Sequence, residues 1–153
     1  MLTVNPGMIY GESIWVAEVN PGRAVANEFL SAVEARLGNE RFALARVTRE
    51  EVQVGQSGVF FVKKRAQSAV VAKYVGQANT WLQGVFVSMS FGSYAKFGLY
   101  LLGSQFVTQK MNSFDELFCF NAFNQICNLV LDHVVSHDLD LPDAKQKPPA
   151  AVR

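Results

Sequence analysis

Apolar and polar positions follow two different periods along the chain. Residues 13–19 form a short, mostly apolar run between two Asn-Pro-Gly turns, which predicts a strand. From Pro21 to Leu37 the apolar residues recur every three or four positions, which predicts a helix with Asn20 as N-cap and Gly38 as its C-terminal stop. The apolar face of this helix should consist of Ala26, Phe29, Leu30, Val33 and Leu37.

The middle of the chain alternates with a period of two and is divided by glycine-containing turns, which predicts a β region. The clearest alternation lies in Leu82–Phe91, where Val85, Val87 and Met89 alternate with Phe86, Ser88 and Ser90. The mixed apolar content predicts a sheet with at least one face covered by helices. The expected strands run from Phe42 towards Val54, Val59–Lys63, Ser68–Val75 and Leu82–Phe91, with Lys64–Gln67 as a link between the second and third.

Helical periodicity returns after the β region. We expect a short helix at Ser93–Leu102 that ends at Gly103, and a long helix from the capping box Ser113–Glu116 to about Ser136. The rest of the chain is rich in Pro, Lys and Ala and is predicted to be a flexible tail. The predicted organisation is an N-terminal strand segment (1–19), a single domain (20–138) and the tail (139–153).

Composition narrows the function classes. The chain has 153 residues, of which 50% are hydrophobic and 18% are charged, and its net charge is +1. These values fit one folded domain with a real core, and without a basic stripe nucleic acid is not an expected partner. Trp81–Val107 is apolar enough to suggest a membrane span, but Lys96 and several glycines and serines interrupt it, so no membrane association is expected.

Cysteine usage and the N-terminal residues predict a cytoplasmic protein. Cys119 and Cys127 would lie roughly 12 Å apart along one helix, too far to form a disulfide with each other. Their apolar neighbours indicate core thiols rather than nucleophiles. The first residues carry no basic region followed by an unbroken apolar stretch, so no secretory signal is predicted.

The long C-terminal helix carries an unusual stripe of amides. At about 100° per residue, its polar residues fall within roughly a 100° arc, and most of the remaining circumference is apolar. Asn is a poor helix former, and solvent-facing stripes usually carry Lys, Glu and Arg. The amides could satisfy backbone groups on a half-buried face, contact a partner, or position a reactant. The arc consists of Asn121, Asn124, Gln125, Asn128 and Asp132.

Three stretches, in this order, resemble the CheC/CheX family of chemotaxis proteins. The first is the helix that Asn20-Pro21 opens and Leu37-Gly38 closes. The second is Gly84–Ser90, followed by Ala95 and Leu101-Leu102-Gly103, which is similar to the family's G-x-V-x-x-S strand and short helix. The third is Asp115-Glu116 followed by Asn121–Asn128. It is similar to a helix motif of Asp or Ser, three residues, Glu, two residues and Asn.

The resemblance implies an α/β (α+β) fold in which helices flank an antiparallel sheet. It also implies a phosphatase of a phosphorylated response-regulator receiver domain. Asn128 would position the attacking water, Gln125 would dock on the partner, and Asn121, Asn124 and Asp132 would contact it. Phosphoryl transfer needs such positioning rather than covalent help. The chain itself would hold no cofactor, because the Mg²⁺ belongs to the receiver domain.

The chain also departs from the family pattern. The family's Glu is Gln125 here, which cannot form the ion pair with a partner lysine, and the Asp or Ser is Asn121. Family members continue into further strands after this helix, whereas a Pro-rich segment follows here. The alternative hypothesis is therefore a non-catalytic adaptor or a structural homodimer, joined through sheet edges or an apolar helix face.

Two histidines near the end of the long helix have the spacing of a metal-binding pair. His133 and His137 are four residues apart and share a helix face. The segment His-Val-Val-Ser-His lacks the glutamate of a metalloprotease motif. No metal site is therefore expected.

Overall fold

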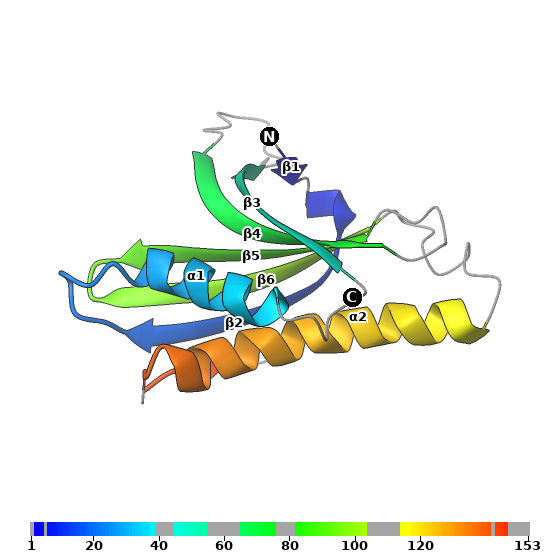
Figure 1. The fold of residues 1–153 in the computed structure, drawn as a ribbon. Helices are drawn as coiled ribbons and strands as arrows, with labels where there is room; N and C mark the ends of the chain where they lie inside the picture. The colour runs from blue at the N-terminus through cyan, green and yellow to red at the C-terminus, as the bar shows by residue number, and fades with distance from the viewer. Residues whose placement is uncertain are drawn as a thin grey trace.

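A computed structural model of the chain shows one mixed β-sheet with both α-helices on the same face (Figure 1). It describes residues 2–4, 6–38, 45–54, 65–75, 82–103, 114–141 and 143–146. The strands are β1 (Leu2–Val4), β2 (Ile9–Glu18), β3 (Ala45–Val54), β4 (Arg65–Tyr74), β5 (Leu82–Phe91), β6 (Tyr94–Gly103) and β7 (Lys145–Gln146). The helices are α1 (Val25–Leu37) and α2 (Phe114–His133), with a 3-10 turn η1 (Pro6–Met8) and a π-helical turn η3 (Val134–Asp138).

The strand order is β1-β3-β4-β5-β6-β2-β7. Every pairing in this order is antiparallel except that of β1 with β3, which is parallel. The fold is therefore α+β, and the prediction of a purely antiparallel sheet is wrong at β1. The position of β2 between β6 and β7 shows that the N-terminal segment is an integral part of the sheet.

The main core lies between the helices and the sheet. Its residues come from one face of each helix and from alternate positions of the strands, because side chains point to one face of a sheet at every second residue. Burial of this apolar surface is the principal source of stability for such a fold. The core includes Val25, Phe29, Leu30, Val33, Leu37, Phe86, Ala95, Phe97, Leu99, Leu101, Phe123, Cys127, Val130 and Leu131.

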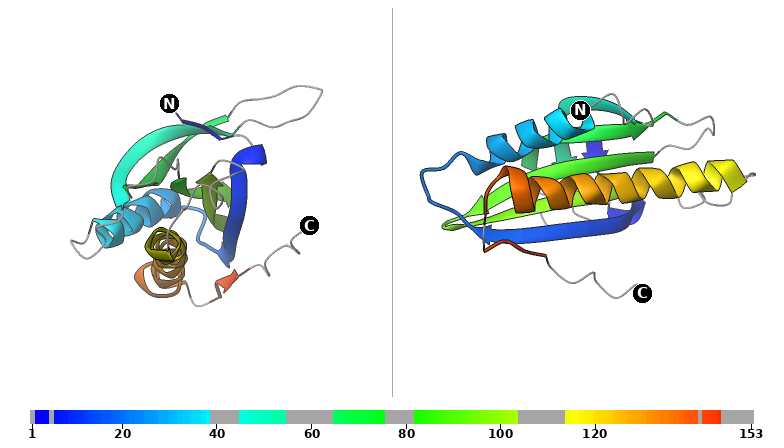
Figure 2. Two further views of the ribbon diagram at one scale, coloured as in Figure 1. Left: turned by 90° about the vertical axis from the view of Figure 1, so that its right-hand side faces the viewer. Right: turned by 60° about the horizontal axis from the view of Figure 1, so that its bottom comes forward.

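The opposite face of the sheet is curved over a second, smaller core. Four strands separate β1 from β2, yet only residues 5–8 connect Val4 with Ile9. In a flat sheet β1 and β2 would lie about 24 Å apart, whereas the connecting chain reaches about 18 Å at most. The sheet therefore curves, as the end view in Figure 2 shows. The second core consists of Val4, Val52, Ala69, Val71, Val85, Val87 and Leu102.

The largest correction to the predicted elements concerns Ser93–Leu102. The sequence predicts a short helix there, but the segment is strand β6, paired with both β5 and β2. Gly92 adopts a positive φ of 61°, which allows a tight hairpin turn directly after β5. In β6, every second side chain from Ala95 to Leu101 points into the main core. The period is therefore two rather than 3.6.

Several predicted boundaries also move. α1 begins at Val25 instead of Pro21. Its N-cap position is Ala24, and Asn20 lies in the preceding turn, where its carbonyl accepts a hydrogen bond from Arg23 N at 2.9 Å. Gly38 ends the helix as predicted. Residues 65–67 of the predicted link belong to β4, because they pair with β3.

The strand predicted at β5 and the long C-terminal helix are confirmed. The predicted flexible tail is wrong in its first part, because Leu139 and Leu141 are buried in the main core and β7 pairs with β2. Outside the described residues lie Phe42, Leu44, the strand predicted at 59–63 and Ser113 of the capping box. Among the residues that are described, no helix has the length and hydrophobicity needed to span a membrane.

Candidate functional site

Three hydrogen bonds join α2 to β2 along one line, which we call the α2–β2 seam. Tyr10 Oη donates to Asn124 Oδ1 at 2.8 Å, Ser13 Oγ donates to Asn128 Oδ1, and Trp15 Nε1 donates to Asp132 Oδ1 at 3.0 Å. The helix residues are spaced by four and therefore lie on one side of α2. The seam thus consists of Tyr10, Ser13 and Trp15 on β2 and Asn124, Asn128 and Asp132 on α2.

The amide of Asn128 is engaged at both of its polar atoms. Its Oδ1 accepts the Ser13 hydroxyl, and its Nδ2 donates to the Asn124 carbonyl at 3.0 Å, one turn earlier in α2. The side chain is half-buried between the helix and the strand. The two hydrogen bonds fix the orientation of the amide, and one N–H of Nδ2 and one lone pair of Oδ1 remain for a further hydrogen bond.

Beneath the seam, Cys127 fills the space above a glycine of β5. Its thiol is fully buried, and burial raises its pKa to about 12. A Cβ added to Gly84 would lie 3.1 Å from Cys127 Sγ, so α2 packs on β5 at this point as closely as a glycine permits. Burial also raises the pKa of Tyr10, with a further contribution from Cys127 and an opposing one from the Asn124 hydrogen bond. Both groups are therefore uncharged hydrogen-bonding or packing groups at neutral pH, and the prediction of Cys127 as a core thiol is confirmed.

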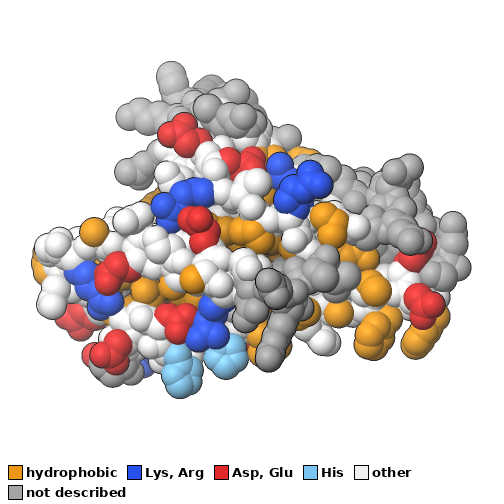
Figure 3. Space-filling model, viewed as in Figure 1, with side chains coloured by type: hydrophobic (Ala, Val, Ile, Leu, Met, Phe, Trp, Pro, Cys, Tyr) orange, Lys and Arg blue, Asp and Glu red, His pale blue; other side chains and the backbone are white. Residues whose placement is uncertain are grey.

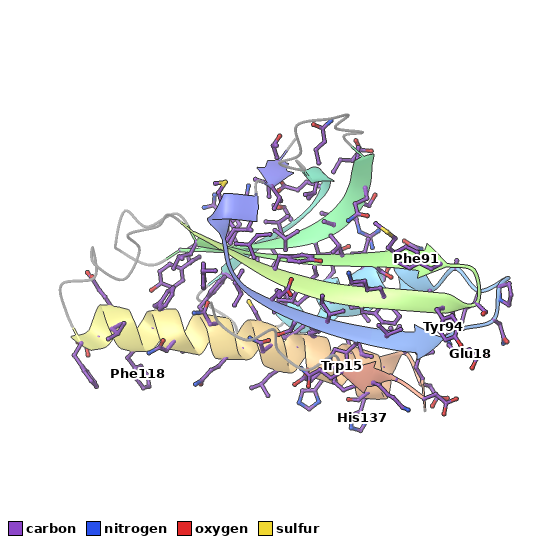
Figure 4. All side chains as sticks on the ribbon, turned by 180° about the vertical axis from the view of Figure 1, so that it is seen from behind. Trp15, Glu18, Phe91, Tyr94, Phe118 and His137 are labelled. Carbon is purple, nitrogen blue, oxygen red and sulfur yellow. The ribbon has the colours of Figure 1, made fainter. Side chains whose placement is uncertain are left out.

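The remaining two residues of the predicted amide arc face outward. Asn121 and Gln125 are both exposed. They lie between large apolar side chains that are also exposed: Phe114 by 80%, Phe118 by 65% and Leu129 by 54%. We call these five residues the outer stripe. In Figure 4, Phe118 points away from the sheet.

The structure thus divides the five predicted site residues into two groups. Asn124, Asn128 and Asp132 belong to the seam, and Asn121 and Gln125 belong to the outer stripe. For the seam group, the interpretation of a half-buried face that satisfies neighbouring polar groups matches the structure. The partners are side chains of β2, however, and not the loop backbone groups that the sequence suggested.

Sequence reasoning missed the three β2 partners of the seam. Ser13 and Trp15 were part of a predicted strand, but nothing assigned them a face of the sheet, and Tyr10 lay before that strand. For Ser13 and Trp15 the spacing contains the missing signal, because Ser13, Trp15 and Ala17 alternate with Glu12, Val16 and Glu18. Tyr10 is out of step with this alternation, and the register of β2 shifts between Ile9 and Gly11. Polar groups at every second strand position lie on one face of the strand, and polar residues four apart lie on one side of a helix. When these two surfaces face each other, the pattern predicts a row of hydrogen bonds between them.

The end of α2 holds the two predicted histidines and a surface ion pair. His133 and His137 stack with ring centroids 6.0 Å apart. Arg36 of α1 binds both carboxylate oxygens of Asp138 through Nε and Nη2, at 2.5 and 2.7 Å, and this hydrogen bonding lowers the pKa of Asp138. Within the ranges described, no three His, Cys, Asp or Glu side chains are grouped closely enough to hold a metal ion.

A second polar location lies on the curved face of the sheet. Gln83 is buried at β5, and its Oε1 has no hydrogen-bond partner. Nearby on the same face, Lys73 lies 3.5 Å from Glu50, which also accepts a hydrogen bond from Thr48 at 2.6 Å. No sequence pattern pointed to Gln83, since a single Gln in an apolar strand is not distinctive.

The chain matches no family model, no curated protein and no solved structure. Inferences about function therefore depend on the seam and the outer stripe.

Proposed function

We propose that the protein is a protein-binding domain and that the outer stripe of α2 is its docking face. The supporting observation is the exposure of Phe114, Phe118 and Leu129 on one side of a long helix. Leu117 to Leu131 contains no charged residue, although solvent-facing helix surfaces normally carry Lys, Glu and Arg. Single exposed apolar residues are common, but three in a row beside neutral amides are typical of an interaction surface.

The seam supports binding rather than catalysis. Asn128, the residue that the CheC/CheX resemblance would use to position water, is half-buried and is held in place by hydrogen bonds to Ser13 and Asn124. Releasing it would leave the part-buried Ser13 hydroxyl without its acceptor, and such a loss typically costs about 1–3 kcal/mol. Asn121 and Gln125 are exposed and can contact a partner without such a loss.

A phosphorylated receiver domain is the partner class that the resemblance suggests, and we propose to test it first. Neutral amides can donate hydrogen bonds to phosphoryl oxygens and to backbone carbonyls of the partner. The chain supplies no carboxylate at position 125 for an ion pair with a receiver lysine, so the expected affinity is moderate.

The test measures binding of receiver domains from the same organism, with and without phosphorylation, by isothermal titration calorimetry. Gln125→Arg should abolish binding by placing a charge in the centre of the outer stripe. Ala35→Arg is the matched control, because Ala35 is exposed on α1 and receives the same charge elsewhere. Binding that survives Gln125→Arg would show that the outer stripe is not the docking face.

Dephosphorylation is measured in the same samples. Acceleration that disappears in a folded Asn128→Ala variant would contradict the non-catalytic proposal and support the phosphatase hypothesis. Phosphorylation-dependent binding without acceleration is the result that we expect.

A further inference from the structure

We infer that the outer stripe also pairs with the outer stripe of a second copy of the chain, with the two α2 helices antiparallel. This inference depends on the proposed function, since it uses the same docking face. If it is correct, self-association and partner binding exclude one another, because each covers the surface that the other needs.

The order of residues in the outer stripe is complementary to itself. Phe118 and Leu129 lie near opposite ends of it, and Asn121 and Gln125 lie between them. When two such helices run in opposite directions, each Phe118 lies opposite the Leu129 of the other copy. Each Asn121 then lies opposite the other copy's Gln125, so apolar groups meet apolar groups and amides meet amides. A two-fold axis through the middle of α2 generates both contacts at once, as in an isologous interface.

The charges at the two ends of α2 favour the same orientation. Asp115 and Glu116 lie in the first turn, and His133 and His137 lie in and just after the last turn. At 100° per residue, Asp115 and His133 lie on the same flank of the helix. An antiparallel pair therefore places the acidic end of each copy beside the histidine end of the other, and it also aligns the helix dipoles favourably. A parallel pair would bring like charges together.

The surface distribution agrees with this arrangement. In Figure 3, hydrophobic side chains gather along the lower right edge of the molecule over the first half of α2, with acidic side chains at the right-hand end. The two histidines lie further left along the lower edge, over the end of the helix. In Figure 4, His137 and Phe118 both lie on the side of α2 away from the sheet.

The available area predicts a reversible dimer. At roughly 200 Å² for a fully exposed aromatic side chain, Phe114, Phe118 and Leu129 offer about 400 Å² of apolar surface per copy, given their exposed fractions. A standard interface buries about 800 Å² on each partner, and the amides and flanking residues supply the polar remainder. We therefore expect dissociation in the micromolar range rather than an obligate dimer.

The first experiment follows the molar mass of the full chain by light scattering and sedimentation velocity, from low to high micromolar concentration. The native chain should shift from monomer to dimer. Phe118→Arg and Leu129→Glu should each stay monomeric, because the side chains are exposed and the substitutions put a charge at an apolar contact. Ala35→Arg should dimerise like the native chain, and circular dichroism should show an unchanged fold for all three variants.

The second experiment tests the antiparallel register. A mixture of the Phe118→Arg chain with the Leu129→Glu chain should form a mixed dimer. In the proposed register, the two substituted positions lie opposite each other with opposite charge, and the second Phe118–Leu129 contact remains native. Failure of the mixture to associate, when the native chain dimerises, would overturn the antiparallel arrangement.

Two further outcomes would overturn the inference, and they separate it from the proposed function. A dimer that persists in both single variants would place the interface elsewhere. A native chain that stays monomeric at all concentrations would exclude self-pairing. If the monomer still binds a receiver domain and loses that binding in Gln125→Arg, the docking proposal stands alone, whereas absence of both kinds of binding removes both proposals.

Discussion

The contact between Gly84 and Cys127 sets how closely α2 approaches the sheet, and it can be tested by substitution. In Gly84→Ala, the added methyl group would lie 3.1 Å from Cys127 Sγ and 3.5 Å from Leu99 Cδ1. Gly84 does not have the positive φ found at Gly92, so the substitution tests packing and not backbone strain. The fully buried thiol would have to move against the main core.

The expected magnitude follows from two opposing effects. Overpacking of a well-packed core typically costs about 1–3 kcal/mol, whereas replacing Gly in a strand gains about 0.5–1 kcal/mol from backbone entropy. We therefore expect Gly84→Ala to lower the free energy of unfolding by about 1–2 kcal/mol. Cys127→Ala alone should cost about 1 kcal/mol, because it removes one buried heavy atom. In the double variant, the new methyl group occupies the space of the lost sulfur, so the two costs should not add.

The assay is equilibrium unfolding in urea, followed by tryptophan fluorescence, for both single variants and the double variant. Gly98→Ala is the control, because a Cβ there meets its nearest neighbour, a Tyr100 ring carbon, at 3.4 Å. It should be close to neutral. Free energy changes of Gly84→Ala and Cys127→Ala that add within about 0.5 kcal/mol would refute the packing contact.

Three further predictions concern the seam, the surface ion pair and the buried thiol. Asn128→Ala should lower the free energy of unfolding by about 1–2 kcal/mol, because it leaves a part-buried serine hydroxyl unpaired. Gln125→Ala should change it by less than about 0.5 kcal/mol, and equal urea midpoints for the two variants would contradict the division of the amide arc. Arg36 holds the pKa of Asp138 below its usual value, so this pair stabilises the fold above pH about 4 and loses its contribution as the pH falls further. Asp138→Asn should therefore lower the free energy of unfolding at pH 7 by less than about 1 kcal/mol, as is typical of an exposed ion pair. At pH 3 the same substitution should leave the free energy of unfolding unchanged. In a Cys119→Ser chain, a thiol reagent at pH 8 should modify Cys127 only at the rate of unfolding, because the thiol is fully buried and burial also raises its pKa to about 12. Rapid labelling of that folded variant would show that the Cys127 thiol is accessible.

The predictability of the fold differs between neighbouring strands for a physical reason. β5 has Val at alternate positions, and its side chains and its period both favour a strand. β6 combines three aromatic residues, which favour strands, with Leu, Ala, Lys and Gly, which do not, and its apolar residues do not alternate with polar ones. Pairing with β5 and β2 determines its structure, and such long-range pairing cannot be derived from local preferences.

The parallel pairing of β1 is a stronger case of the same limit. A strand of three residues carries almost no periodic signal, and its partner β3 lies about fifty residues later in the chain. Because only residues 5–8 connect β1 with β2, β1 can reach β3 only if the sheet curves. The sequence therefore predicted an α+β fold with covered sheet and long C-terminal helix, but not the mixed sheet or the second core.

For the candidate site, the sequence indicated the correct helix and the correct arc of amides. It did not indicate which amides face β2, because α2 is apolar around most of its circumference and its rotation on the sheet is set by packing. The close fit of Cys127 over Gly84 is part of that packing.

The order in which the chain is synthesised gives the position of β2 a consequence in the cell. β2 leaves the ribosome well before its neighbour β6, which ends at Gly103, and its seam partners on α2 follow about 115 residues behind their β2 counterparts. At the usual 5–20 residues per second, this strand waits for roughly 5–20 s before its partners exist. During that time the apolar side chains of β2 are exposed to other nascent chains. Translation speed and holding chaperones should therefore influence the yield of folded protein more than the stability of the finished fold does.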